Sequence, residues 1–599
     1  MAPLASQNPN AFAVFAGGLL SQTAANINAL PPTADIPDSV PLCEFMYNES
    51  YGRYSASKAR NPYTCGVTGT SYTSKQVPER VDLLARAIAK RLGFSPNEGT
   101  EWDRVVAVYS VNTIDYIPLS HAVHRLSGIV TPANAQYSAA ELEHQLVSSG
   151  AKAVFTCLPL LETALKASDA AGIPRSAVFL LPVPGGKPHP DFPSVDDLVA
   201  QGRSLPAPPA LSWIKGQGAR QTAFLCYSSG TSGLPKAVMI SHFNIISNII
   251  QMTLLQSVGR KQDNVITENV LGILPLSHIY GLTVVAHVSQ YRGDQLVILP
   301  KFDLPLFLRT IQDHKLNFLP VVPPMLIQLI TNQQVVAKYN LDSVRCVFSG
   351  AAPLGIETQE AANKMFPKWK IGQGYGMTET SPVATASSEI DLVPGSSGCL
   401  LPGYKAKLID AEGNVVTGHD QRGELLLQSP SVVLGYLHNE KANAETFVHH
   451  ADGRWIRTGD EAVVRKSPKG NEHVFITDRI KELIKVKGFQ VAPAELEAHL
   501  LTHDYVHDCT VIPVDDDRAG EVPKAFVVKS PAAISSGQPD PAIRRAVEEH
   551  VEKHKTKYKW LKGGVEFIDA IPKSPSGKIL RRVLKDKEKA ARKAQGAKL

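Results

Sequence analysis

The chain has 599 residues, of which 43% are hydrophobic, 20% charged and 7% aromatic, values typical of globular proteins. This composition excludes a disordered, collagenous or coiled-coil protein, and the length indicates more than one hydrophobic core. The net charge is only +6, but residues 551–599 contain 12 Lys and 3 Arg against 5 acidic residues. A solvated helical face over 581–593 is the favoured explanation, and a nucleic acid, an anionic membrane or a polyanionic small ligand are the alternatives.

Cysteine usage and apolar segments constrain the cellular environment. The seven cysteines are an odd number and no two are closer than 22 residues, so neither a disulfide framework nor CxxC metal spacing is predicted. No run approaches the ~20 apolar residues of a membrane span. The apolar segment 11–20 is preceded by no Lys or Arg, unlike a secretory signal or a transit peptide. We therefore expect an intracellular protein in a reducing compartment.

Short apolar runs alternate with longer amphipathic ones over the first 350 residues, a pattern typical of parallel sheets with crossover helices. The stretch 182–209, rich in Pro and Ala, is expected to be a long surface connection. A helix is expected at 114–126. Strands are expected at 104–110, 151–157, 221–227, 264–274, 295–299, 315–322 and 343–349.

The pattern changes from residue 406 onward. Short alternating strands separated by Gly-containing turns predict antiparallel β structure. A further boundary is expected at 478–481, and a helix at 493–501 begins with Pro493 in its first turn. We therefore divide the chain into an N-terminal domain at 1–480, with a β-rich part at about 400–480, and a C-terminal domain at 481–599.

The strongest local motif is YSSGTSGLPK at 227–236. Small hydroxyl and glycine residues between two strands form a loop whose N–H and O–H groups can surround phosphate oxygens, followed by a lysine that neutralises charge. The motif is not a Walker A loop, because Pro235 occupies the place of the second glycine. A surface turn would not by itself require four Ser or Thr residues and a lysine.

A second glycine run, IGQGYGMTET at 371–380, fails as a dinucleotide fingerprint because Met377 stands where the third glycine is required. It is expected to be a tight turn that presents an aromatic ring, a hydroxyl and a carboxylate, carried by Tyr375, Thr378 and Glu379. Such a ring can stack on a base, and the carboxylate can hold Mg²⁺ beside phosphate oxygens.

Taken together, these motifs resemble the adenylate-forming superfamily of acyl-CoA synthetases, firefly luciferases and peptide-synthetase adenylation domains, and most closely its 4-coumarate:CoA ligase-like branch. Five more motifs follow the family order between residues 105 and 582. They are LPLSHIYGL at 274–282, SGAAPLG at 349–355, WIRTGD at 455–460, TDRIKELIKVKGFQ at 477–490 and PKSPSGK at 572–578. The resemblance implies an α/β fold, with doubly wound sheets and a β-rich subdomain followed by a small mobile α+β domain.

The resemblance also assigns roles around ATP. Adenine lies beside Gln373, Gly374 and Tyr375, with Gly376 in the same nucleotide-binding run. The β- and γ-phosphates are held by the loop residues Ser228, Ser229, Gly230, Thr231, Ser232, Gly233 and Lys236.

Four further groups complete the implied nucleotide site. Thr378 contacts the α-phosphate, and Glu379 ligates Mg²⁺. Asp460 accepts hydrogen bonds from both ribose hydroxyls, which suits a carboxylate, and Arg479 assists there.

Two groups are implied in the chemistry itself. His278 is an electropositive group beside the acyl carboxylate, and Lys578 reaches the point where charge concentrates in the first transition state. The family hinge corresponds to Lys481, about which the C-terminal domain rotates between the two steps. The rotated domain presents Lys485, Lys487 and Gly488 for thioester formation with coenzyme A.

By the same resemblance, the implied acyl pocket leaves room for a flat ring or an alkyl chain. Val284 stands where many hydroxycinnamate-activating relatives carry a serine, and an unpaired buried hydroxyl costs ~1 to 3 kcal/mol. An apolar aryl or medium-chain aliphatic acid is therefore favoured. The lining residues are Ile279, Tyr280, Val284, Gly350, Ala351, Pro382 and Val383.

The expected reaction converts a carboxylic acid and ATP to an acyl-adenylate and then to a coenzyme A thioester. A free-standing adenylation domain that loads a carrier protein and a luciferase-like oxygenase remain alternatives. The last three residues, Ala597, Lys598 and Leu599, resemble the SKL class of peroxisomal signals. A peroxisomal import receptor is thus an expected partner, whereas no nucleic acid and no stable membrane insertion are expected.

Overall fold

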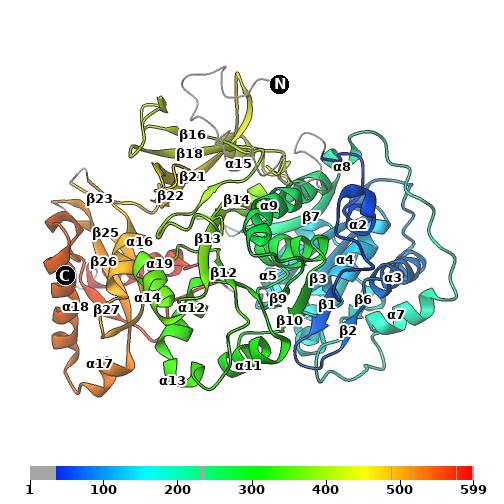
Figure 1. Cartoon of the computed structure of the whole chain (residues 1–599), viewed down its shortest axis with the longest axis horizontal. Coiled ribbons are helices and arrows are strands. Elements are labelled where there is room, and N and C mark those ends of the chain that lie inside the picture. Colours follow the sequence, from blue (N-terminus) through cyan, green and yellow to red (C-terminus); the bar gives the residue numbers. More distant parts are fainter. Residues whose placement is uncertain (1–35, 229–234, 488, 517, 575–576, 597–599) are drawn as a thin grey trace.

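A computed structural model describes residues 36–228, 235–487, 489–516, 518–574 and 577–596 (Figure 1). A seven-stranded sheet has the order β19-β8-β7-β4-β3-β5-β6. Neighbours from β7 to β6 are parallel, whereas β8 and β19 run antiparallel at one edge. Its strands are β3 (Val105–Tyr109), β4 (Ile129–Ala133), β5 (Ala153–Thr156), β6 (Val178–Leu180), β7 (Thr222–Ser228), β8 (Lys236–Ser241) and β19 (Gly435–Tyr436).

A nine-stranded sheet follows the order β15-β14-β13-β12-β11-β9-β10-β1-β2 and is parallel from β13 to β1. Its inner strands are continuous apolar runs because helices cover both faces of a parallel sheet. The strands are β1 (Tyr63–Cys65), β2 (Ser71–Tyr72), β9 (Asn269–Gly272), β10 (Gln295–Ile298), β11 (Phe318–Val321), β12 (Cys346–Ser349), β13 (Lys370–Gly376), β14 (Val383–Ala386) and β15 (Cys399–Leu400).

Two buried helices connect these sheets. Helix α9 (His242–Gln262) contacts β7 and β8 of the first sheet, and it also packs on the π-helix η7 (Tyr280–Val288), which contacts β9 of the second. All nine residues of η7 are buried. A helix that is apolar on all sides is stable only when protein surrounds it. The LPLSHIYGL motif thus leads into the core between the two sheets.

A six-stranded antiparallel sheet follows, as the alternating pattern predicts. The path β17-β16-β18-β21-β20 is extended by β22 on β21. Long strands β21 and β22 pair Asp460 with Arg479 and so bring two of the motifs face to face. The strands are β16 (Lys405–Ile409), β17 (Val415–Val416), β18 (Arg422–Gln428), β20 (Phe447–His450), β21 (Gly453–Lys466) and β22 (Glu472–Arg479).

The last part of the chain forms a five-stranded sheet with its own apolar cluster. Its helix α16 (Pro493–Leu500) contacts α14 (Ile356–Met365) and β22, so this unit lies against the preceding sheets (Figure 1). The strands are β23 (Ile484–Val486), β24 (Phe489–Val491), β25 (Val506–Asp516), β26 (Gly520–Lys529) and β27 (Val565–Phe567), with helices α18 (Asp540–His554) and α19 (Arg581–Gly596).

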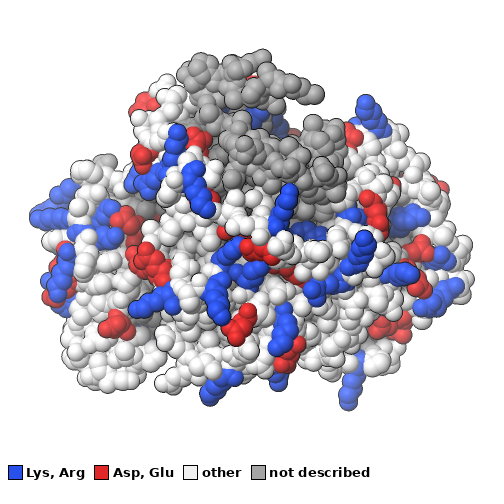
Figure 2. All heavy atoms as spheres, viewed as in Figure 1, with Lys and Arg blue, Asp and Glu red and all other residues white. Residues whose placement is uncertain are grey.

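The basic C-terminal segment is extensively paired with acidic groups. Arg592 bonds Glu588 at 2.9 Å, and Lys587 bonds Glu566 at 2.9 Å. On the face shown in Figure 2, the described Lys and Arg side chains are interspersed with Asp and Glu. These contacts support the solvated helical face that the sequence favours.

A strand is present at each of the seven ranges where the sequence predicts one, and the α/β class is confirmed by the sheet order. Two expectations were wrong. The stretch 182–209 contains helix α7 (Val195–Gly202), whose Val195 and Leu198 are buried. Residues 371–376, expected to form a turn, belong to strand β13, and the turn is the 3-10 helix η8 (Thr378–Thr380).

Two observations concern the cysteines and the described helices. All seven cysteines are buried free thiols. Among the helices of the described ranges, none combines the length and apolar character needed to cross a bilayer.

Candidate active site

The motifs converge where β13, β21 and β22 approach the segment that precedes α19. The hydroxyl of Tyr375, on β13, donates a 2.6 Å hydrogen bond to Asp460 Oδ2. Arg479 Nε lies 3.7 Å from Oδ1 of the same carboxylate. Burial raises the pKa of Asp460, and Arg479 and Tyr375 oppose that shift. The carboxylate predicted to bind ribose is therefore held in place by both predicted neighbours.

The carboxylate of Glu379 is positioned by two hydroxyl groups. Ser228 Oγ donates to Glu379 Oε1 at 3.2 Å, and the hydroxyl of Tyr436 donates to the same oxygen at 2.8 Å. The ammonium of Lys236 lies 4.7 Å from the centre of the Tyr436 ring. Ser228, near one end of the phosphate-loop motif, thus contacts Glu379 directly, and Lys236, at the other end, lies beside the tyrosine that also contacts Glu379. Residues 229–233 of that loop lie outside the described residues.

Lys578 faces this cluster from the C-terminal unit. The Ser574 N–H donates to the Lys578 carbonyl at 2.8 Å, and Gly577, directly before Lys578, has a φ of 81°. Burial lowers the pKa of Lys578 to about 8, aided by Arg479 and opposed by Glu482, Glu379 and Asp460. The structure therefore brings this lysine to the carboxylates of the larger unit.

His278 lies beside the same lysine. Burial lowers the pKa of His278 to about 4, and the positive charge of Lys578 acts in the same direction. Its Nδ1 accepts a hydrogen bond from the Tyr280 N–H at 3.3 Å, so the neutral ring carries its proton on Nε2. His278 is thus a neutral N–H donor, which differs from the electropositive group expected from the sequence.

The segment predicted to lie beside adenine depends on close backbone approach. A Cβ on Gly376 would lie 2.0 Å from the Pro382 carbonyl oxygen, and one on Gly374 would lie 2.5 Å from the Phe348 ring. Only glycine fits at these positions. The Gln373 side chain accepts a 3.1 Å hydrogen bond from the Leu354 N–H, which fixes the end of β12 to β13.

Four of the seven residues predicted for the acyl pocket, Ile279, Tyr280, Val284 and Gly350, lie in or beside η7. The hydroxyl of Tyr280 donates to the Phe348 carbonyl at 2.8 Å, and its ring packs against Gly350. Ile279 and Val284 are buried in the same helical segment. The remaining predicted residues lie at the ends of β12 and β14, namely Ala351, Pro382 and Val383.

The lysines predicted for thioester formation lie on the hairpin of β23 and β24. Lys485 is exposed, and its N–H donates to Glu521 at 2.8 Å. Lys487 has a φ of 49°, and its N–H donates to the Ala519 carbonyl at 2.8 Å. Lys481 lies in the turn before β23, and Gly488 lies outside the described residues. This arrangement presents Lys578, rather than this hairpin, to Asp460.

The sequence did not single out Tyr436 or Glu482. Tyr436 meets Glu379 across 57 residues of sequence, so no local pattern marks it. Glu482 and Glu497 bind Arg581 at 2.5 and 2.6 Å, which ties the segment after the predicted hinge to the start of α19. Arg581, at the start of α19, therefore joins the turn that follows Lys481 to helix α16.

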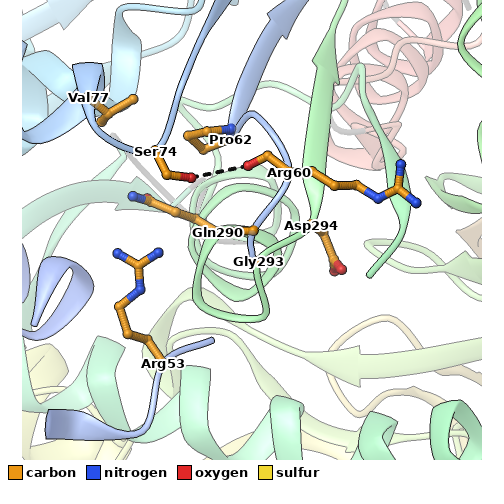
Figure 3. Close-up of a pocket in the computed structure, with 9 residues that line it drawn as sticks. Arg53, Arg60, Pro62, Ser74, Val77, Gln290, Gly293 and Asp294 are labelled. Atoms are coloured by element: carbon orange, nitrogen blue, oxygen red, sulfur yellow. Dashed lines mark hydrogen bonds between the residues drawn. The ribbon is translucent and has the colours of Figure 1, made fainter. Parts of the chain in front are cut away.

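A separate hollow lies below the edge of the nine-stranded sheet (Figure 3). It is lined by groups that include Arg53, Ser74 and Asp294, and Ser74 Oγ donates to the Arg60 carbonyl at 3.2 Å. Asp294 is already paired with Arg260 at 2.8 Å. No residue of the seven motifs lines this hollow, so it is distinct from the candidate active site.

The fold and the site together define an adenylate-forming enzyme. Residues 54–437 match the family described as AMP-binding enzyme, and residues 495–578 match the AMP-binding enzyme C-terminal domain. Because the first match spans more than half of the chain, the chain belongs to the AMP-binding enzyme family. The superfamily predicted from the seven motifs is confirmed.

Relatives match almost the whole length. The chain is 41% identical over 561 residues to acyl-CoA ligase AKT1 of Alternaria alternata, covering 93% of this chain and 96% of the relative. It is 38% identical over 556 residues to acyl-CoA ligase easD of Emericella nidulans, covering 92% and 97%. The solved anthranilate CoA ligase AuaEII, in complex with anthranoyl-AMP, superposes with a TM-score of 0.79 at 22% identity, covering 94% of this chain and 99% of that one.

Proposed function

We propose that the chain is an AMP-forming carboxylate:CoA ligase. The observation that carries this function is the convergence of Lys578 with Asp460, Glu379 and His278, which come from separate motifs. In the first step, a carboxylate oxygen attacks the α-phosphorus of ATP and pyrophosphate leaves. In the second, the thiol of coenzyme A attacks the acyl carbon and AMP leaves.

The residues present suit charge stabilisation rather than covalent catalysis. Lys578, as its ammonium, is aimed at the site where negative charge builds up between the carboxylate and the α-phosphate. His278 offers an Nε2 proton to an acyl oxygen, as its neutral tautomer requires. Asp460, fixed by Tyr375, accepts from the ribose hydroxyls. Positioning of the two substrates supplies much of the remaining rate.

Glu379 fits the proposed role of Mg²⁺ ligand. Both hydrogen bonds that the described residues donate to its side chain go to Oε1, so Oε2 is the oxygen available to a cation. Mg²⁺ prefers carboxylate oxygens together with substrate phosphates. When bound with ATP, the ion would neutralise part of the negative charge of the phosphates.

For the second step, we propose that the C-terminal unit turns about Lys481 and presents the hairpin of Lys485 and Lys487 to coenzyme A. Lys485 is exposed and free to meet a ligand phosphate, whereas Lys578 is half-buried and faces the carboxylates of the larger unit in the arrangement described. The proposed acid is apolar, either aryl or medium-chain aliphatic, because Val284 is buried and offers no hydrogen bond.

We also propose a peroxisomal address. The tripeptide Ala597, Lys598 and Leu599 lies outside the described residues, directly after helix α19. An import receptor reads such a tripeptide at a free carboxyl terminus. The address is independent of the ligase activity.

One assay distinguishes the ligase from the alternatives. The purified protein is mixed with ATP, Mg²⁺ and a panel of carboxylic acids, with and without coenzyme A, and AMP and thioester are measured. A ligase releases stoichiometric AMP and thioester only when coenzyme A is present. Adenylate formation with no thioester would instead support carrier loading, and light emission or oxygen uptake would support an oxygenase.

A further inference from the structure

A cluster of histidines lies on the C-terminal unit, where α16 packs on α18. His499 is on α16, and His550 and His554 are one turn apart on α18. The ring centres are 4.2 Å apart for His499 and His550, and 5.2 Å apart for each of these with His554. One ring nitrogen from each residue lies within 4.8 Å of the others. None of these residues belongs to the seven motifs.

The hydrogen bonds define which nitrogen of each ring has a free lone pair. His499 Nε2 lies 3.2 Å from the His550 carbonyl, and His550 Nε2 lies 3.3 Å from the His499 carbonyl. His550 Nε2 also lies 2.9 Å from the hydroxyl of Thr502, which donates its own proton to the His499 carbonyl and so accepts from the ring. His554 Nδ1 lies 2.8 Å from the His550 carbonyl. A carbonyl only accepts, so each of these nitrogens carries the proton and the opposite nitrogen keeps its lone pair.

This pattern is the one that metal-binding histidines show. A ligating imidazole usually donates its second ring N–H to a carbonyl or a carboxylate, which fixes the tautomer and the direction of the lone pair. All three histidines already make that hydrogen bond to a backbone carbonyl.

The surrounding groups define the rest of the site. His503 contacts His550 at 5.0 Å, but its Nδ1 accepts the Tyr505 N–H at 3.1 Å, so its Nε2 carries a proton. The charges that act on His499 are those of Lys555 and of Glu357 on α14. Lys555 is itself paired with Glu495 at 3.3 Å. The imidazoles of His499, His550 and His554 therefore remain as the candidate ligands, with solvent available for a fourth position.

We propose that His499, His550 and His554 bind Zn²⁺, with water as the fourth ligand. Zn²⁺ prefers imidazole nitrogen and tetrahedral geometry, and the i,i+4 pair with a third histidine supplies three ligands. The rings of His499 and His550 are stacked within 7° of parallel, and a metal lies in the plane of each ligating ring. Binding therefore rotates one of these two rings out of the stack and breaks its hydrogen bond to the carbonyl, so the hydrogen bonds described above position the other two histidines.

The test uses the full-length protein without an affinity tag, titrated with ZnCl₂ in a calorimeter. One Zn²⁺ per chain is expected, and MgCl₂ gives no heat at this site because it prefers oxygen ligands. His554→Ala, an exposed position that leaves the fold intact, weakens binding by about tenfold or more. His499→Ala has the same effect. His507→Ala, an exposed histidine on β25 of the same unit, is the matched control and binds as the parent does.

The proposal is overturned if the parent protein binds no Zn²⁺, or if His554→Ala and His507→Ala bind it equally well. Zinc K-edge absorption provides a second measurement, with three nitrogen ligands expected in the parent and fewer in His554→Ala. Neither measurement uses ligase turnover, so failure of the zinc site and failure of the proposed reaction are distinguishable.

Discussion

The hydroxyl of Tyr436 donates a 2.8 Å hydrogen bond to Glu379 Oε1, and the ring of the same side chain lies 4.7 Å from the ammonium of Lys236. Tyr436 is on β19, the edge strand that pairs with β8, and Lys236 begins β8. One side chain therefore positions both the carboxylate proposed to hold Mg²⁺ and the lysine proposed to hold phosphate. Sheet pairing, rather than sequence proximity, brings the three groups together.

Replacing Tyr436 by Phe removes the hydrogen bond and keeps the ring. We expect the first half-reaction to slow by about tenfold, because a hydrogen bond to a charged group contributes about 1.5 to 3 kcal/mol. The loss should be largest at low Mg²⁺, measured as acid-dependent pyrophosphate exchange against Mg²⁺ concentration. Tyr436→Leu, which also removes the ring, should be slower still. Equal rates for the parent and Tyr436→Phe would show that the hydroxyl does not orient Glu379.

Lys578 is proposed to act in only one of the two half-reactions, the formation of the acyl-adenylate. Lys578→Ala should lower acyl-adenylate formation by about 10² to 10³ fold, because a charge aimed at the transition state is removed from a site that excludes water. Conversion of supplied acyl-adenylate and coenzyme A to thioester should continue. Quenched-flow measurement of each half provides the comparison. Equal loss in both would contradict rotation of the C-terminal unit about Lys481.

The pKa of Lys578 predicts a pH dependence. Burial lowers this pKa to about 8, so the ammonium loses its proton as pH rises through that value. The kcat/KM for ATP in adenylate formation should therefore fall on the alkaline side, since this parameter reports the free enzyme. Lys578→Arg keeps its charge throughout and should lack that decline, whatever its absolute rate. An alkaline limb shared by both proteins would assign the titration to another group.

The sequence predicted those parts of the fold and site that depend on local pattern. The strand β3 is a run of five buried residues, and the antiparallel β21 and β22 follow from alternation and Gly-containing turns. The helix α7 was missed because it lies in a stretch rich in Pro. Its only sequence signals are Ser194, which caps its N-terminus, and the four residues that it buries. Tyr436 was missed because its partner is supplied by sheet pairing. The neutral state of His278 was missed because it depends on burial and on Lys578, which lies 300 residues later in the sequence.

The proposed peroxisomal address predicts where the protein accumulates. A fluorescent fusion at the N-terminus leaves the terminal tripeptide accessible and should give a punctate pattern that coincides with a peroxisomal marker. Removal of Ala597, Lys598 and Leu599 should make the pattern diffuse and leave ligase activity in the lysate unchanged. A diffuse pattern for the full-length fusion would refute the address and would leave the ligase assignment intact.

The proposed preference for an apolar acid rests on Val284. This side chain is 1% exposed on η7, the helix that also carries Tyr280. A phenolic hydroxyl buried against Val284 would lose its hydrogen bonds to water, at a cost of about 1 to 3 kcal/mol. We expect cinnamate, phenylacetate or a medium-chain fatty acid to exceed 4-coumarate in kcat/KM, a comparison in which the shared ATP and coenzyme A terms cancel.

Val284→Ser should reduce that difference, because the new hydroxyl can pair with the phenol. Val284→Ala is the matched control, since it creates space without a hydrogen-bonding group and should favour no hydroxylated acid. Both variants are measured with the same pair of acids. A general loss of stability lowers kcat/KM for both acids alike and therefore cancels in the ratio of the two values. A clear preference of the parent protein for 4-coumarate would show that Val284 does not contact the acid. An equal change of the kcat/KM ratio in the two variants would show the same.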